Sequence, residues 1–283
     1  MDETACRTLL CFDLTNAAGF HAQLTGILAG LAFTSIVLIL QSSTLSGRGA
    51  EAGLLSFSSA LISLLIAAFL YGTAAGEERL AGRLAILVFL AGTASAVAVL
   101  ELFYGLTWLV RAGGFPNATE MMARMSALVI PLITFVYLVI TALNQASITT
   151  GREVVGSPLF VFLSVLSLLL VLVLLLVQLL WTSARLRRLA LWCASGLGPE
   201  PWLSLVSVGV GLIAGLCGGI TLQLEPTIAA PDWLVGAILS LWFGFDCVVV
   251  LLVRAIDTEP TPRQLPEPEQ VLSALDADYG LKR

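Results

Sequence analysis

The stretch PLFVFLSVLSLLLVLVLLLVQLLW, residues 158–181, is almost entirely apolar and contains no charged side chain. As an α-helix rising about 1.5 Å per residue, it would cross a hydrocarbon core about 30 Å thick. Apolar side chains cover every face of this helix, and a helix of that kind is surrounded by lipid or by other apolar helices. The stretch therefore predicts a membrane-spanning helix with broad exposure to lipid.

Six further stretches of similar length and character lie on both sides of this helix. They cover residues 24–44, 52–75, 83–110, 123–146, 202–224 and 232–253. Over the whole chain 58% of the residues are hydrophobic and 12% are charged, against about 25% charged residues in soluble proteins. The sequence therefore predicts an all-α, polytopic membrane helix bundle with seven transmembrane helices at residues 24–254. Short tails, residues 1–23 and 255–283, would lie outside it.

Arginine residues are distributed unequally between the two ends of the predicted spans. With seven spans, the N-terminal tail and the loops after the second, fourth and sixth spans share one side, which holds four: Arg7, Arg79, Arg83 and Arg152. The opposite side holds eight before the last two residues of the chain: Arg48, Arg111, Arg124, Arg185, Arg187, Arg188, Arg254 and Arg263. Because positively charged loops stay in the cytoplasm, the N-terminus is predicted outside and the C-terminus inside a cell membrane.

Two segments outside the spans indicate partners. The segment WTSARLRRLALW after the fifth span places Arg185, Arg187 and Arg188 between two tryptophans, which favours contact with the anionic lipids of the inner leaflet. The C-terminal tail is acidic and rich in proline, a composition typical of a disordered segment, either simply solvated or used to bind a protein partner. Nucleic acid is not expected as a partner, because no basic stripe exists beyond this short loop.

Two carboxyl groups lie deep inside predicted spans. Glu101 comes ten residues before Arg111, and Asp246 comes eight residues before Arg254. At about 1.5 Å per residue, both carboxyls are therefore predicted about 12–15 Å from the cytoplasmic boundary. An ionisable side chain at such a depth destabilises insertion by about 2.5–3.5 kcal/mol, so each is a candidate functional group.

Further polar residues are predicted at the same depth and form, with Glu101 and Asp246, a candidate ion, proton or solute site. They are Ser59, Tyr104 and Gln178. Such a layer could hold a proton or a cation between two carboxylates. The alternative is that each carboxyl stays protonated and, like the hydroxyl and amide groups, serves as a packing contact between helices.

Serine residues also follow one face of the second span. Ser56, Ser59 and Ser63 recur at helical spacing, so their hydroxyl groups form a stripe.

Glycines remove the side chains from one face of two spans, which allows another helix to approach closely. Span 1 is predicted to pack antiparallel on span 6 through these faces, although the same stripes could instead meet in a homo-oligomer. Pro131 lies inside the fourth span and predicts a kink there. The helix-packing glycines are Gly26, Gly30, Gly211, Gly215 and Gly219.

Catalytic and cofactor chemistry is not indicated. The only histidine, His21, lies just before the first span and is predicted to be an interfacial residue. The spans therefore contain no histidine-based metal cluster and no Ser-His-Asp triad, and the chain has no phosphate-binding loop or dinucleotide fingerprint. No lysine lies in any span, which excludes a retinal Schiff base. We predict no metal, no cofactor and no enzymatic activity.

The leading hypothesis is a small-solute or ion permease, or a channel, that uses the polar layer with its two carboxylates. The alternative is a non-catalytic membrane scaffold or regulatory protein whose cytoplasmic tail binds a partner. Seven spans are also compatible with two parallel three-helix repeats on either side of a fourth span, which would put the two carboxyls at equivalent places.

Overall fold

The computed structural model describes residues 13–42, 47–77, 82–150, 158–180, 199–225 and 231–258. Within these ranges the chain forms seven helices and no strand, and each helix covers most of one predicted span. They are α1 (Leu14–Gln41), α2 (Arg48–Ala75), α3 (Gly82–Ala112), α4 (Pro116–Thr150), α5 (Pro158–Leu180), α7 (Pro199–Thr221) and α8 (Asp232–Thr258). The predicted lipid-binding arginines Arg185, Arg187 and Arg188 and the tail from residue 259 lie outside the described ranges.

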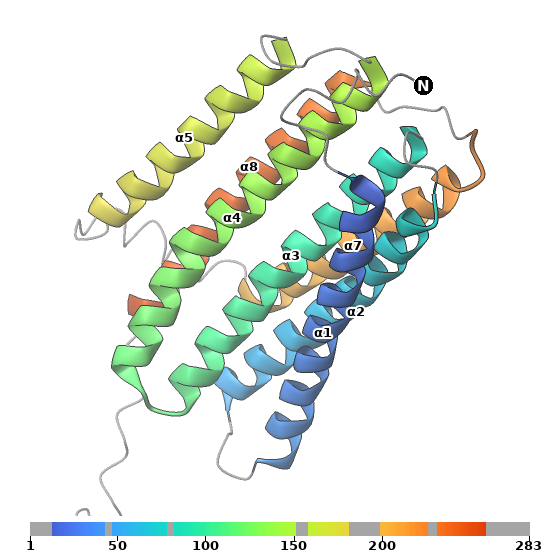
Figure 1. The fold of residues 1–283 in the computed structure, drawn as a ribbon. Helices are drawn as coiled ribbons and strands as arrows, with labels where there is room; N and C mark the ends of the chain where they lie inside the picture. Colours follow the sequence, from blue (N-terminus) through green and yellow to red (C-terminus); the bar gives the residue numbers. More distant parts are fainter. Residues whose placement is uncertain are drawn as a thin grey trace, which may run out of the picture.

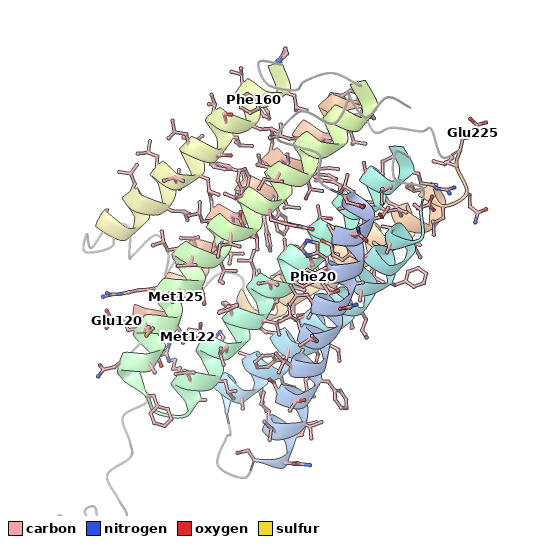
Figure 2. All side chains as sticks on the ribbon, viewed as in Figure 1. Phe20, Glu120, Met122, Met125, Phe160 and Glu225 are labelled. Carbon is pink, nitrogen blue, oxygen red and sulfur yellow. The ribbon has the colours of Figure 1, made fainter. Side chains whose placement is uncertain are left out.

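Five of these helices, α1, α2, α3, α4 and α7, are long and apolar enough to cross a membrane, and α5 and α8 add the shorter apolar stretches Pro158–Leu174 and Trp233–Cys247. The outer surface of the bundle is apolar as well, since Leu168, Leu216 and Leu241 are 72%, 69% and 76% exposed. Figure 2 shows such side chains pointing outward from the helices. A surface of this kind suits lipid rather than water, so the predicted all-helical membrane architecture is confirmed.

The helices pack around α3, which is the most deeply buried of the five long apolar helices. Consecutive helices α1, α2, α3 and α4 lie side by side, and α7 packs on α2 and α3. On the other side of α3, α4 packs on α8, and α5 covers α8 and α4 at the edge of the bundle (Figure 1). Helices α2 and α7 therefore pack on one side of α3. Helix α4 packs on the other side and separates most of α8 from α3.

Local contacts explain where several helices begin and end. The Asp13 carboxylate accepts a hydrogen bond from the backbone N–H of Asn16 and caps α1. Gly114 follows α3 with φ of +77°, a left-handed conformation that lets the chain turn into α4. Arg83 forms an ion pair of 2.7 Å with Glu77 and donates to backbone carbonyls just after α7. This arginine therefore joins the ends of α2, α3 and α7.

The glycine face of α7 packs on α2. A Cβ atom at Gly211 would lie 2.8 Å from Ser63 Oγ and 3.2 Å from Ser63 Cα, and one at Gly215 would lie 3.1 Å from Ile66 Cγ2. A Cβ atom added at Gly218 would overlap the side chain of Leu70, also on α2. The prediction that span 1 is the partner of this face is therefore wrong, because α2 occupies it.

Three of the predicted packing glycines are not contacted by another helix among the described residues. A Cβ atom at Gly26, Gly30 or Gly219 would meet no other atom within 4 Å. For α7 the reason is helical geometry. An i, i+4, i+8 series drifts by about 40° at each step, whereas i and i+7 differ by only about 20°. Gly218 therefore continues the face that Gly211 begins, and Gly219 turns away from it.

Candidate functional site

Glu101 lies in the middle of α3 and is completely buried. Neither carboxyl oxygen has a hydrogen-bond partner among the described residues. The closest polar groups are the hydroxyls of Ser56 and Ser59 on α2, which lie beside the carboxyl without completing a hydrogen bond to it. The approach is close because a Cβ atom at Gly105, one turn after Glu101, would lie only 3.0 Å from Ser56 Cβ. Glycine at this position therefore lets the serine face of α2 reach the carboxyl.

The serine face of α2 continues into the contact with α7. Ser63 donates a hydrogen bond of 3.0 Å to the backbone carbonyl of Ser207, and contacts between α2 and α7 advance in the same direction along both helices. Ser204, about one turn before Ser207, therefore lies at about the depth of Ser59. Its hydroxyl is buried and has no hydrogen-bond partner in the described part of the chain. Because Ser204 lies at this depth on a helix that packs on both α2 and α3, we group it with Glu101, Ser56 and Ser59 under the name Glu101 site.

Asp246 on α8 is also completely buried, and both of its carboxyl oxygens lack a hydrogen-bond partner among the described residues. Its surroundings are apolar, because Val249 and Val250 on the same helix belong to the main hydrophobic cluster. Trp242, one turn earlier, belongs to that cluster too, and its indole N–H has no acceptor in the described structure. The helix that carries this second carboxyl packs mainly on α4 and α5 and touches α3 only slightly.

The contacts of α4 relate the depths of the two carboxyls. Thr107 Oγ1 lies 3.3 Å from Ser126 Oγ, and the rings of Phe135 and Phe243 lie 6.4 Å apart. Helix α4 is antiparallel to both α3 and α8 (Figure 1). Counting from these contacts, Glu101 and Asp246 both lie opposite Leu132. The two carboxyls therefore share one depth but lie in different interfaces of the bundle.

Tyr104 and Gln178 are the remaining residues of the predicted polar layer. Tyr104 is fully buried on α3 and belongs to the same hydrophobic cluster as Trp242. Gln178 lies near the end of α5, and its side chain is outside the described part of the structure. The Glu101 site is thus made by α2, α3 and α7, whereas Tyr104 belongs to the cluster that surrounds Asp246.

A third polar cluster was not predicted from the sequence. His21 of α1 packs between two tyrosines, with ring centroids 5.3 Å from Tyr71 of α2 and 5.1 Å from Tyr137 of α4. The two tyrosine hydroxyls lie 2.6 Å apart in a hydrogen bond that crosses α3 at Gly92. A Cβ atom at Gly92 would lie 3.2 Å from Tyr137 Cε1, so glycine is what allows the two rings to meet. His21 is accordingly a half-buried packing residue rather than a simple interfacial one.

Tyr71→Phe is expected to lower the stability of the bundle, because it removes the only polar atom that Tyr71 contributes to this hydrogen bond. The loss should be about 1 kcal/mol, the typical contribution of a single hydrogen bond. Thermal unfolding in detergent provides the measurement. Tyr137→Phe should cost about the same, and the double variant should add little to either change, since both act on one bond. Fully additive losses would show that the hydroxyl pair does not stabilise the fold.

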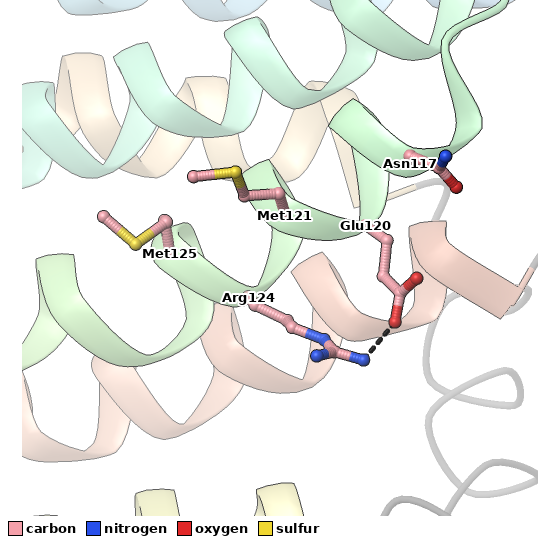
Figure 3. A pocket seen from close by; sticks show the side chains of 5 residues that line it. All are labelled: Asn117, Glu120, Met121, Arg124 and Met125. Carbon is pink, nitrogen blue, oxygen red and sulfur yellow. Dashed lines mark hydrogen bonds and ion pairs between the residues drawn. The ribbon is translucent and has the colours of Figure 1, made fainter.

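Neither Glu101 nor Asp246 lines the two clefts described on the surface of the bundle. One of about 320 Å³ lies at the start of α4, where Glu120 and Arg124 form an exposed ion pair (Figure 3). Arg124 is eight residues, or about 12 Å, from the depth of Glu101. Another cleft of about 420 Å³ lies where the start of α1 meets the end of α2. In the described ranges no three His, Cys, Asp or Glu side chains converge on a common point that could hold a metal ion.

Comparison with known proteins adds no relative: no family model, no curated protein and no solved structure matches the chain. The class of the protein therefore follows from its fold and site alone. Over the ranges that the structure describes, it is an all-helical bundle of membrane type with two buried carboxyl groups at one depth, neither of which has a hydrogen-bond partner among those residues.

Proposed function

We propose that this protein is a permease or channel for a small solute or ion, and that Glu101 binds a proton or a small cation during transport. The observation that carries the proposal is the burial of this carboxyl, without a hydrogen-bond partner among the described residues, in the middle of an apolar helix. A buried polar group without a partner destabilises a fold by about 1–3 kcal/mol. Such a group in a membrane helix is typical of a pathway for protons or ions.

The Glu101 site has the chemistry needed to hold either form of the carboxyl. Protonated Glu101 is neutral and suits the apolar interior of α3. After the proton leaves, the hydroxyls of Ser56 and Ser59 can rotate and donate hydrogen bonds to the carboxylate, since a serine hydroxyl is both donor and acceptor. A cation arriving in place of the proton would meet carboxylate and hydroxyl oxygens, which are the ligands that hard cations prefer. The site therefore favours exchange of a positive charge over a fixed contact.

The glycine face of α7 supports access to this site. Gly211 and Gly215 bring α7 against α2 with few side chains between the two helices, so a small displacement of α7 requires little repacking. Ser204 lies on the same helix, so a displacement that moves α7 along α2 would also change the surroundings of Glu101. The proposal includes a location in the cell membrane with the C-terminus in the cytoplasm, and it requires no enzymatic activity.

The test is a flux assay with the purified protein in liposomes that contain a pH-sensitive dye. An imposed gradient of protons, sodium or potassium should drive proton movement in the wild-type protein. Glu101→Gln keeps the shape of the side chain but can neither bind nor release a proton, so its flux should fall to that of protein-free liposomes. Glu120→Gln is the matched control, because Glu120 is exposed and paired with Arg124 on the surface, and its flux should equal that of wild type.

Unchanged flux in a well-folded Glu101→Gln protein would remove Glu101 from the proposed pathway. Absence of any flux in the wild-type protein would favour the alternative class, a membrane scaffold. That class predicts that removal of residues 259–283 abolishes the binding of a partner protein, which the permease does not require.

A further inference from the structure

Asp246 has surroundings that a packing role does not explain. Its side chain is 0% exposed, and both oxygens lack a partner among the described residues. The indole N–H of Trp242, four residues earlier and thus on the same face of α8, is also without an acceptor in the described structure. A hydrogen-bond donor and two acceptors are therefore left unpaired within one turn of one helix. An unpaired buried polar group destabilises the fold unless a ligand satisfies it.

Helix α4, on which α8 packs, adds another polar group near this depth. By the contacts described above, Pro131 of α4 lies at about the depth of Asp246. Proline has no backbone N–H, so the carbonyl of Ala127 loses its normal helical donor. Ala127 is fully buried in the same cluster as Trp242. Close to this depth, α4 and α8 thus carry acceptors and a donor that suit a proton and one water molecule.

The charged and titratable groups around Asp246 lie on its own helix and on the helices packed against it. On its own helix the neighbour is Cys247, and on α3 the groups at its depth are Glu101 and Tyr104. On α4 the nearest titratable group along the helix is Tyr137, about 7.5 Å from that depth, and its hydroxyl is hydrogen-bonded to Tyr71. The nearest charged group on α4 is Arg124, about 12 Å from that depth, and α5 contains no titratable residue. Helix α8 packs mainly on α4 and α5 and touches α3 only slightly, while the polar neighbours of Glu101 lie on α2.

We infer that Asp246 and Trp242 form a second proton-binding site, which exchanges its proton independently of Glu101. In this exchange a hydronium ion gives its proton to a carboxylate oxygen of Asp246 and becomes water. In the reverse step the proton returns to water, and the Trp242 N–H then donates to the carboxylate, directly or through one water molecule. No other bond forms or breaks. The protein would accordingly bind two exchangeable protons, one on α3 beside the serines of α2 and one on α8.

Infrared difference spectroscopy of the purified protein in lipid nanodiscs tests this site without any transport assay. A protonated carboxyl has a carbonyl stretch that disappears when the proton leaves, and 13C-labelled aspartate shifts the bands of aspartate away from those of glutamate. The wild-type protein should show one band of a buried aspartate that disappears as the pH is raised and returns as it is lowered. The band should be absent from Asp246→Asn. It should persist in Glu101→Gln with a midpoint that moves by less than about half a pH unit.

Trp242→Phe serves as a second variant, because it keeps an aromatic ring in the cluster and removes only the N–H donor. Its Asp246 band should titrate with a midpoint changed by at least about half a pH unit. An aspartate band that does not titrate in wild type would overturn the site, and an unchanged midpoint in Trp242→Phe would remove Trp242 from it. A midpoint that moves by more than about one pH unit in Glu101→Gln would show one coupled site instead of two. The flux assay tests Glu101, whereas the infrared titration tests Asp246. Either outcome of the flux assay therefore leaves the test of the Asp246 site unchanged.

Discussion

Glu101→Leu is expected to unfold at a higher temperature than the wild-type protein and to lose its proton flux. Leucine has nearly the volume of glutamate and has no polar atoms to leave unpaired at a fully buried position. Replacement of a buried polar or ionic group by an apolar one of similar size is often stabilising, by about 1–3 kcal/mol when the group has no partner. Ser59 keeps its own hydrogen bond, because it donates to the backbone carbonyl of Ser56.

The measurement is intrinsic tryptophan fluorescence during heating in detergent, together with the flux assay. Glu120→Leu is the control, since it removes a carboxylate from an exposed ion pair and should change stability by less than about 0.5 kcal/mol. Higher stability combined with lost flux is the pattern of a functional group retained at the expense of stability. A Glu101→Leu protein less stable than wild type would instead identify the carboxyl as a structural contact and contradict the proposed function.

The depth of each carboxyl could be predicted from the sequence, but its interface could not. Depth depends on one helix only, because residues can be counted from Arg111 or Arg254 at a fixed rise. The interface depends on which helices are neighbours and how far each is rotated. In the structure Glu101 lies beside the serines of α2, whereas Asp246 lies on α8, which packs mainly on α4 and α5 and touches α3 only slightly. Which helices surround each carboxyl therefore came from the structure.

The tyrosine pair shows a further limit of reasoning from one helix at a time. Tyr71 and Tyr137 lie on different helices, and their hydroxyls meet only because α3 has a glycine, Gly92, between them. No spacing within α2 or α4 indicates such a contact. The first span was predicted to begin at residue 24, yet α1 begins at Leu14, and His21 on this added part of the helix packs on Tyr71 and Tyr137. Apolar length alone therefore did not predict where this helix begins.

Glycine spacing identified the smooth face of α7 but not the helix that packs on it. An i, i+4 pair is sufficient for close approach by any neighbour, so Gly26 and Gly30 of α1 looked like an equally suitable partner. In the structure α1 leaves those glycines uncovered, and α2 meets α7 through Ser63 and Ile66. Small residues therefore mark where contact is possible, while larger residues on the neighbouring helix determine where it occurs.

Gly211→Leu is expected to destabilise the bundle strongly, whereas Gly219→Leu should not. A side chain at Gly211 would meet the Ser63 backbone at 3.2 Å as well as its hydroxyl at 2.8 Å. Backbone cannot rotate away as a flexible side chain can, so α2 and α7 must separate, with a loss of about 1–3 kcal/mol or more. At Gly219 no atom lies within 4 Å of the added Cβ, and leucine should stabilise the helix by up to about 1 kcal/mol.

The two variants are matched because each adds the same side chain to the same helix and gains the same helix propensity. Their difference in thermal stability in detergent therefore measures the contact between α2 and α7 alone. Gly211→Ala should show a smaller loss than Gly211→Leu, since most of the clash with Ser63 grows with the length of the side chain. Equal stability of Gly211→Leu and Gly219→Leu would mean that both positions face lipid. The packing of α7 on the serine face of α2 would then be wrong, and Ser204 would no longer belong to the Glu101 site.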